Sequence, residues 1–231
     1  MATPIRPRTS TRAWIPRSST EGPLQAPTRR TVHGSVIALL LLPLAAGVAG
    51  TALDRLGANP VEEFTHLTGE WALRCLLLSL AVTPVRRFSG AAIQPYRRSF
   101  GLLAYAYGVV HFSVYLVFDL AFDFSLLFED VAERPYITVG FAALVGLTPL
   151  VVTSSRAWQA RLGRRWVALH RLVYLVAILA IVHFWWFVKA DHLGPALHAG
   201  LLAVLLGVRL LPRQPPADAG NRGWGAGLGH G

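Results

Sequence analysis

The chain has 231 residues, of which 53% are hydrophobic and only 15% are charged, and its mean hydropathy is +0.45. This composition excludes an ordinary soluble domain, because the apolar residues are gathered in long runs. A single Cys and a single Met exclude a disulfide framework, a Cys-ligated zinc site and an iron–sulfur cluster. The net charge of +10 would suit a nucleic-acid-binding protein, but the charges lie in short clusters between uncharged runs, as in the loops of a membrane protein.

Six apolar runs are long enough, or nearly so, to cross a hydrocarbon core about 30 Å thick as helices. In chain order they are 31–53, 71–85, 99–118, 135–155, 166–188 and 192–208, the last extending to 211. The second run is the weakest, because it is short and contains Arg74, whose long side chain can reach the membrane surface. The sequence therefore predicts an all-α membrane protein, with a bundle of six transmembrane helices over residues 31–211.

The segments on either side of this domain have a different composition. Residues 1–30 are basic and rich in Pro, Ser and Thr, and residues 212–231 are rich in Gly and Pro, so we predict two disordered tails. Arg29 and Arg30 could belong to a twin-arginine or secretory signal. The apolar run that follows is long for a signal, however, and a positive flank before the first span explains the two arginines better.

The distribution of charge between alternate loops predicts the orientation of the bundle. One set of loops and tails is strongly basic and contains Arg6, Arg8, Arg12, Arg17, Arg29, Arg30, Arg86, Arg87, Arg97, Arg98, Arg156, Arg161, Arg164, Arg165, Arg209, Arg213 and Arg222. The other set contains most of the acids, namely Asp54, Glu62, Glu63, Glu70, Asp119, Asp123, Glu129, Asp130, Glu133 and Asp191. By the positive-inside rule, both termini are predicted to be cytoplasmic.

Histidines are the residues most able to carry chemistry in this chain. His111 and His183 lie deep within the third and fifth spans, and His170 lies one turn into the fifth. An imidazole at membrane depth is costly unless it is paired or bound to a metal, and neutral imidazole is a common axial ligand of haem iron. A lone histidine would more simply form a hydrogen bond between helices. Two on separate spans beside aromatic residues favour haem.

Depth along the spans selects one pair among these three residues. At 1.5 Å per residue, the depths of His111 and His183 differ by about 7–8 Å, and those of His111 and His170 by about 12 Å. His111 and His183 are therefore the preferred ligand pair, nearer the outer face. On a straight helix His170 and His183 would point about 140° apart, so we expect a bulge, a kink or two different binding surfaces.

Five short motifs lie in order along the chain: Gly-Ala-Asn-Pro at 57–60, His-Leu-Thr-Gly at 66–69, Arg-Pro-Tyr at 134–136, Leu-Gly-Arg-Arg-Trp at 162–166 and His-Arg-Leu-Val-Tyr-Leu at 170–175. Together with the two histidines of the fifth span and the one in the third, they resemble the ferric-reductase-like transmembrane domain and, more closely, the MsrQ (YedZ) family. The similarity runs from about residue 33 to 211, and the long N-terminal tail is a departure from the family.

The MsrQ family consists of haem-binding membrane subunits of a bacterial protein-methionine-sulfoxide reductase system. The resemblance implies one or two haem b groups in the bacterial inner membrane, with His111, His170 and His183 as axial ligands. It also implies electron transfer from quinol, or from flavin (FMN) reduced by a cytoplasmic reductase, to a periplasmic molybdenum-containing reductase of the MsrP kind. That partner would reduce methionine sulfoxide in envelope proteins, so no catalytic residue is expected in this chain.

A second haem with two histidine ligands would need His near position 97 or 98, and both positions are Arg. A haem at His170 would therefore need a different second ligand or an open position, or else His170 contacts quinone or flavin. Arg164, Arg165 and Arg171 could pair with haem propionates or with flavin phosphate, although anchoring to lipid headgroups is the simpler role.

Two further predictions concern His66, placed in an outer loop, and Trp166, placed in an interfacial belt with Trp185 and Trp186. Two other classes of function remain open. One is a ferric-reductase-like or other haem b electron carrier with a different acceptor, and the other is a haem-free assembly factor. The absorption spectrum separates the second class from the haem proteins.

Overall fold

The structure, a computed structural model, describes residues 29–53 and 55–211. The predicted tail 212–231 and residues 1–28 of the predicted tail 1–30 lie outside this part, and Arg29 and Arg30 already belong to the first helix. Every regular element of the described residues is a helix, which confirms the all-α prediction. Five helical stretches are long and apolar enough to cross a membrane: Val32–Ala52, Tyr96–Asp119, Pro135–Val152, Arg164–Phe187 and Leu193–Leu210. The chain is therefore a multi-pass membrane protein.

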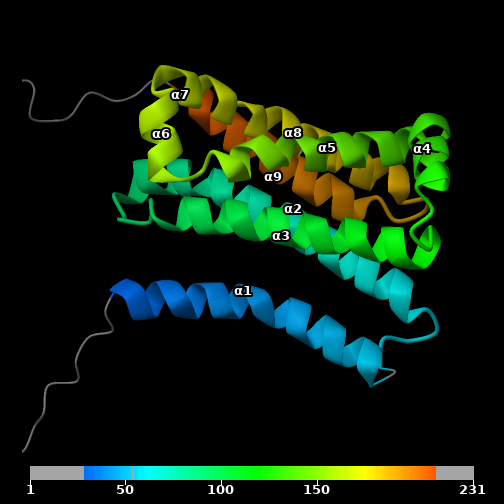
Figure 1. Ribbon diagram of the computed structural model, residues 1–231. Coiled ribbons are helices and arrows are strands. Elements are labelled where there is room, and N and C mark those ends of the chain that lie inside the picture. The colour runs from blue at the N-terminus through cyan, green and yellow to red at the C-terminus, as the bar shows by residue number, and fades with distance from the viewer. Residues whose placement is uncertain (1–28, 54, 212–231) are drawn as a thin grey trace, which may run out of the picture.

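The long helices run back and forth along one common direction (Figure 1). The elements are α1 (Arg29–Ala52), α2 (Pro60–Ser89), α3 (Tyr96–Val114) with the π-helical turn η1 (Tyr115–Asp119), α4 (Phe124–Glu133), α5 (Pro135–Val152), α6 (Arg156–Leu162), α7 (Arg164–His170), α8 (Leu172–Phe187) and α9 (Leu193–Leu210). The short helices α4 and α6 lie in segments predicted as loops. Both ends of the described chain lie at the end of the bundle that carries α6 and α7, and α4 lies at the opposite end.

Local signals explain where α2 begins and ends. Asn59 caps the helix by accepting a hydrogen bond from the backbone N–H of Glu62 (3.3 Å), and Pro60 occupies the first turn. Gly90 closes the helix in the left-handed conformation, with φ of 66°. The helix therefore starts well before the predicted span 71–85, and it includes His66. The prediction that His66 lies in an outer loop is wrong, because Asn59 and Pro60 start α2 before His66.

Helix α2 supplies much of the core, although it is not among the five apolar stretches. Leu73, Cys75, Leu76, Leu77 and Leu80 are all buried, and α2 contacts α1, α3, α8 and α9. A helix enclosed by other helices does not expose all its sides to lipid, which makes a lower hydropathy tolerable. The charged Arg74 pairs with Glu70 of the same helix.

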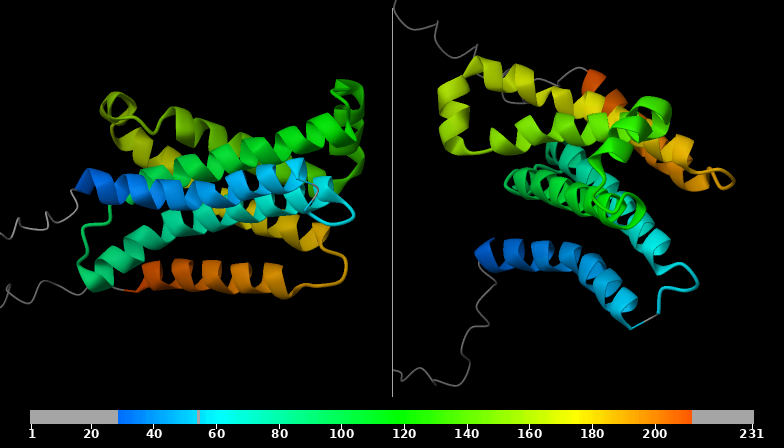
Figure 2. Two further views of the ribbon diagram at one scale, coloured as in Figure 1. Left: turned by 90° about the horizontal axis from the view of Figure 1, so that it is seen from below. Right: turned by 45° about the vertical axis from the view of Figure 1, so that its right-hand side comes forward.

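Packing is closest within two pairs of helices, α2 with α3 and α5 with α8, and weaker between the two pairs. Figure 2 shows α1 on one side of the α2–α3 pair and the α5–α8 pair on the other. The hydroxyl of Tyr107 on α3 donates to the carbonyl oxygen of Leu40 on α1 (2.7 Å), which ties α1 to the bundle. His111 and His183, two of the three predicted ligands, lie where these two pairs meet.

The predicted fifth span, 166–188, is interrupted at Arg171, where α7 ends and α8 begins. The backbone N–H of Arg171 bonds to Ala168 and that of Tyr174 bonds to Arg171, and both are tighter i to i+3 bonds. This tighter turn changes the direction of the side chains that follow. The expected irregularity is therefore present, and His170 and His183 contact opposite ends of α5.

Candidate functional site

The imidazole rings of His111 on α3 and His183 on α8 lie next to each other. Their centroids are 6.1 Å apart, and their planes are inclined at 80°. The two residues come from different closely packed helix pairs, so the site lies where the α2–α3 pair meets the α5–α8 pair. Each histidine is also near the end of its helix, His111 close to Val114 and His183 close to Phe187. Both therefore lie toward the end of the bundle that carries α4.

Each ring is held by a backbone carbonyl of the partner helix in its own pair. Nδ1 of His111 is 3.0 Å from the carbonyl oxygen of Thr65 on α2, and Nδ1 of His183 is 2.7 Å from that of Tyr136 on α5. A carbonyl oxygen can only accept, so both Nδ1 atoms carry the proton. The opposite nitrogen, Nε2, is then an unprotonated lone pair in both residues. Histidines that bind metals are oriented by hydrogen bonds of this kind.

Two glycines make these contacts possible. A Cβ atom at Gly69 on α2 would lie 3.0 Å from Nδ1 of His111, and one at Gly140 on α5 would lie 2.6 Å from Nδ1 of His183. In both helices the glycine follows the accepting residue by four positions, as Gly69 follows Thr65 and Gly140 follows Tyr136. The residue four positions on lies directly above a helical carbonyl, so a missing side chain leaves that carbonyl accessible to the imidazole.

The donor set fits haem better than a bare metal ion. A zinc site needs three or four protein ligands, whereas a porphyrin supplies four equatorial nitrogens and leaves two axial positions for the protein. Among the described residues no group of three or more His, Cys, Asp or Glu could hold a metal ion. Two imidazoles bound to one metal through nitrogens about 2 Å away would have ring centroids about 6 Å apart, in agreement with the separation of His111 and His183.

Aromatic side chains and a third imidazole border the pair. The rings of Tyr136 and Phe187 are each 6.5 Å from that of His183. His66 packs against Phe187, with centroids 5.0 Å apart, and its Nε2 lies 3.8 Å from Glu62. Sequence reasoning missed this position of His66. The signal was the spacing of three between His66 and Gly69, which places both on one face of a helix.

His170 lies away from the other two histidines, thirteen residues and so about 20 Å along the helical path from His183. Its ring stacks on Trp166, with centroids 3.9 Å apart, and its Nε2 is 3.0 Å from Oγ1 of Thr153. That hydroxyl donates to the carbonyl oxygen of Pro149 (2.6 Å), so it accepts from His170. Nε2 of His170 is thus protonated and engaged, unlike Nε2 of the other two histidines.

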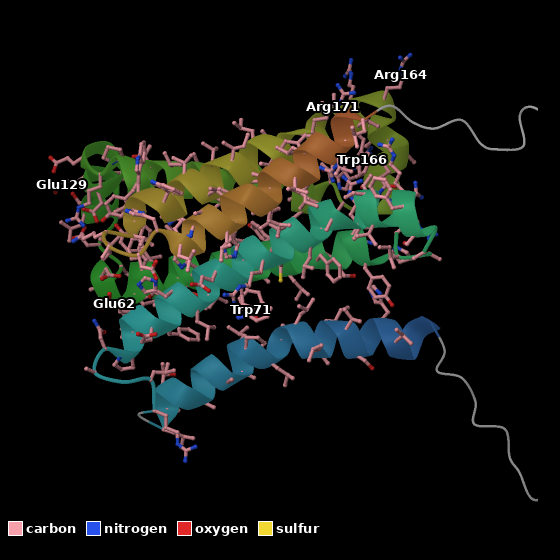
Figure 3. All side chains as sticks on the ribbon, turned by 180° about the vertical axis from the view of Figure 1, so that it is seen from behind. Glu62, Trp71, Glu129, Arg164, Trp166 and Arg171 are labelled. Carbon is pink, nitrogen blue, oxygen red and sulfur yellow. The ribbon has the colours of Figure 1, made fainter. Side chains whose placement is uncertain are left out.

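The three predicted arginines lie at the same end of the bundle as His170. Arg164, Arg165 and Arg171 are exposed, and Figure 3 shows Arg164 and Arg171 projecting away from the helices, opposite Glu62 and Glu129. At 1.5 Å per residue, Arg171 is about 18 Å from His183 along the helices. A propionate role for these residues would therefore concern a group bound near His170. Trp166, predicted for an interfacial belt, lies at this same end, where it is half-buried, packs on His170 and donates to the carbonyl oxygen of Thr153 (2.9 Å).

Residues 68–181 match the family "Ferric reductase like transmembrane component". This matched segment includes His111 and His170 and ends two residues before His183. The class of protein is therefore a ferric-reductase-like transmembrane domain.

Curated relatives narrow this class to one family. The "Protein-methionine-sulfoxide reductase heme-binding subunit MsrQ" of Xanthomonas axonopodis pv. citri is 48% identical over 190 residues, 76% of this chain and 87% of the relative. The proteins of that name from Xanthomonas oryzae pv. oryzae and Ralstonia nicotianae are 52% identical over 157 residues and 45% identical over 185 residues. Those matches cover 68% and 78% of this chain, and 72% and 85% of the relatives. The chain belongs to the MsrQ family.

Proposed function

We propose that this chain is a haem-binding subunit of a methionine sulfoxide reductase system, with one haem b held between His111 and His183. The observation that carries the proposal is the pair of imidazoles 6.1 Å apart, each anchored through Nδ1 to a carbonyl of a different helix pair. This arrangement leaves both Nε2 lone pairs as the available ligands. The names of the curated relatives support haem as the group that is bound.

The bound haem supplies one-electron transfer by cycling between its ferric and ferrous forms. The chain itself fixes the two imidazole planes through Thr65 and Tyr136, so the ligand geometry changes little when the charge of the group changes. Phe187 and Tyr136 border the site with aromatic surface, which keeps water away and lowers the local polarity. In this proposal the partner reduces the sulfoxide, and this chain carries electrons to it.

The proposed direction of electron transfer rests on the orientation of the bundle, which the asymmetry of charge between its two ends supports. We propose that α2 crosses the bilayer with the five apolar stretches, so that both termini are cytoplasmic in the bacterial inner membrane. The end with Arg164 and Arg171 then faces the cytoplasm, and the end with Glu62 and Glu129 faces the periplasm (Figure 3). The His111–His183 pair lies nearer the periplasmic end, where it can pass electrons to a periplasmic molybdenum-containing reductase of the MsrP kind.

The cytoplasmic end is the proposed entry point for electrons from quinol or reduced FMN. We propose that His170 contacts this donor and does not ligate iron, because its Nε2 already bonds to Thr153. The exposed guanidinium groups of Arg164, Arg165 and Arg171 surround the same end and suit the phosphate of a flavin.

Reduced-minus-oxidised absorption spectra of the purified chain test the proposal. We expect a Soret band and an α-band in the wild type, and their loss in both His111→Ala and His183→Ala. His198→Ala is the matched control, because His198 bonds through Nδ1 to Gly194 of its own helix (2.8 Å) and should leave the spectrum unchanged. A colourless wild type, or full haem content in either ligand variant, would contradict the assignment. Co-purification with a soluble molybdoenzyme then tests the partner.

A further inference from the structure

Arg209 on α9 has its guanidinium group inside the bundle. Its Nη2 donates to the carbonyl oxygen of Leu80 on α2 (2.5 Å). The Nε and Nη1 atoms are buried and have no hydrogen-bond partner among the described residues. These two atoms carry three of the five N–H groups of an arginine, so most of the donors of a permanently charged side chain are unused.

The surroundings of Arg209 contribute little negative charge. The ring of Tyr174 on α8 lies 5.1 Å from Cζ, which gives a cation–π contact. The three ion pairs of the described residues involve other side chains, at Glu62, Glu70 and Asp130. Burial of Nε and Nη1 without a carboxylate is expensive, since the hydration of these two atoms is lost without replacement.

A second positive group makes the imbalance larger. Arg97, in the first turn of α3, lies beside Arg209, because the two arginines bond to neighbouring residues of α2, Ser79 and Leu80. Its backbone is held there, because the hydroxyl of Ser79 on α2 donates to the carbonyl oxygen of Arg97 (3.0 Å). Four elements, α2, α3, α8 and α9, thus meet around two arginines.

We propose that Arg209 is a binding residue for an oxyanion, a carboxylate or a phosphate, that enters the bundle beside Tyr174 and Arg97. The anion would accept charge-assisted hydrogen bonds from Nε and Nη1 and would neutralise the local excess of positive charge. The two sources are a carboxylate of a bound haem and the phosphate of FMN. Both sources rest on the proposed function, and the FMN source places the phosphate on Arg209 and not on the exposed Arg164, Arg165 and Arg171. The unused donors of Arg209 exist whatever the chain binds elsewhere.

The position of Arg209 is compatible with both sources of the anion, and the two would approach it from opposite ends of the bundle. Tyr174 precedes His183 by nine residues, so Arg209 lies about 13–14 Å from the histidine pair along the helix axis. A haem propionate would reach Arg209 from the histidine pair, which lies on the periplasmic side of Arg209. The phosphate of FMN would arrive from the cytoplasmic end, where His170 lies.

The competing explanation is a purely structural link between α9 and α2, and Arg87 provides the matched control for it. Nη1 of Arg87 donates to the carbonyl oxygens of Val208 and Leu211 (3.2 and 3.1 Å), so it joins the same two helices from an exposed position. Arg87→Gln weakens this link without touching the buried group. Asp218→Asn tests whether the anion is a carboxylate of the chain's own C-terminal segment.

The experiment uses the full-length, haem-loaded chain in lipid nanodiscs, as wild type, Arg209→Gln, Arg209→Lys, Arg87→Gln and Asp218→Asn. We measure the haem-to-protein ratio and the haem midpoint potential. We also measure the affinities for FMN and for riboflavin, which lacks the phosphate, by fluorescence quenching with inorganic phosphate as competitor. If the anion is a phosphate, Arg209→Gln weakens FMN binding by about tenfold or more and leaves riboflavin binding unchanged. If it is a haem carboxylate, the midpoint potential falls in Arg209→Gln, because a nearby positive charge favours the reduced state.

Arg209→Lys keeps the charge but not the planar fork, so it should fold and show a smaller change of the same kind; it decides the question if Arg209→Gln does not fold. The proposal is overturned if the folded Arg209 variants match the wild type in both FMN affinity and midpoint potential. It is also overturned if Arg87→Gln produces the same changes, or if Asp218→Asn raises the affinity for FMN, because Asp218 then competes for Arg209 as the resident anion. Absence of haem from every sample would instead contradict the proposed function, and FMN binding would still test Arg209.

Discussion

Gly140 leaves the imidazole of His183 just enough room against α5: a Cβ atom at this glycine would lie 2.6 Å from Nδ1 of the histidine. Gly69 does the same for His111 on α2, at 3.0 Å. In both helices the accepting carbonyl belongs to the residue four positions before the glycine. Two separate helix pairs therefore orient a histidine in the same way.

Gly140→Ala should lower haem affinity by roughly tenfold or more, because the added methyl group moves the ring of His183 away from the carbonyl that orients it. Gly69→Ala should have a smaller effect, since its clash with His111 is milder. The haem-to-protein ratio and the α-band measure both. Gly200→Ala is the control, as a Cβ atom there meets nothing within 4 Å. Equal haem content in Gly140→Ala and Gly200→Ala would show that the close approach is unimportant.

His66→Ala should keep its haem, in contrast to His111→Ala. His66 packs against Phe187 and lies near Glu62, so it borders the pair without completing it. We expect an unchanged haem-to-protein ratio, with a shift in midpoint potential because a polar group beside the site is removed. Loss of the low-spin spectrum in this variant would instead identify His66 as a ligand.

His170→Ala should retain the low-spin spectrum, because the His111–His183 pair does not depend on this residue. Thr153→Val removes the hydroxyl that accepts from His170 and should cost about 1 kcal/mol of stability. Absorption spectra and thermal unfolding of the two variants measure these effects. If one haem is released per chain in His170→Ala, a second haem is bound at this end and the single-haem proposal is wrong.

Single cysteines test the orientation of the bundle. The native Cys75 is fully buried, and Cys75→Ala provides a background without thiols. In intact cells a membrane-impermeant maleimide should label Glu129→Cys, at the predicted periplasmic end. Arg164→Cys should react only after the membrane is permeabilised. The reverse pattern would invert the topology and the proposed direction of electron transfer.

The five apolar spans could be predicted from the sequence because hydropathy over about 20 residues is a strong signal. The closeness of His111 and His183 could also be predicted, since a constant rise per residue converts sequence position into depth. The full length of α2 was missed because its first turns are polar, and its start is marked by Asn59 and Pro60 and not by hydropathy. A search restricted to apolar runs therefore placed His66 in a loop.

Other features depend on contacts between distant residues, which hydropathy does not contain. The roles of Gly69 and Gly140 appear only when α2 is placed against α3 and α5 against α8. The tighter turn at Arg171 is a local change in hydrogen bonding, and no residue type in 168–174 predicts it. The sequence predicts Arg209 to belong to a basic cytoplasmic flank. It does not show that the guanidinium group of this residue turns toward α2 and α8.

The separate packing of the two helix pairs has a consequence for assembly in the membrane. Each imidazole is oriented by a hydrogen bond within its own helix pair, so neither pair needs the other to position its histidine. Under the proposed function, haem would join these two preformed helix pairs, and its removal should weaken the contacts between the pairs while each pair keeps its internal contacts. Maturation of the protein would accordingly end with haem insertion instead of beginning with it.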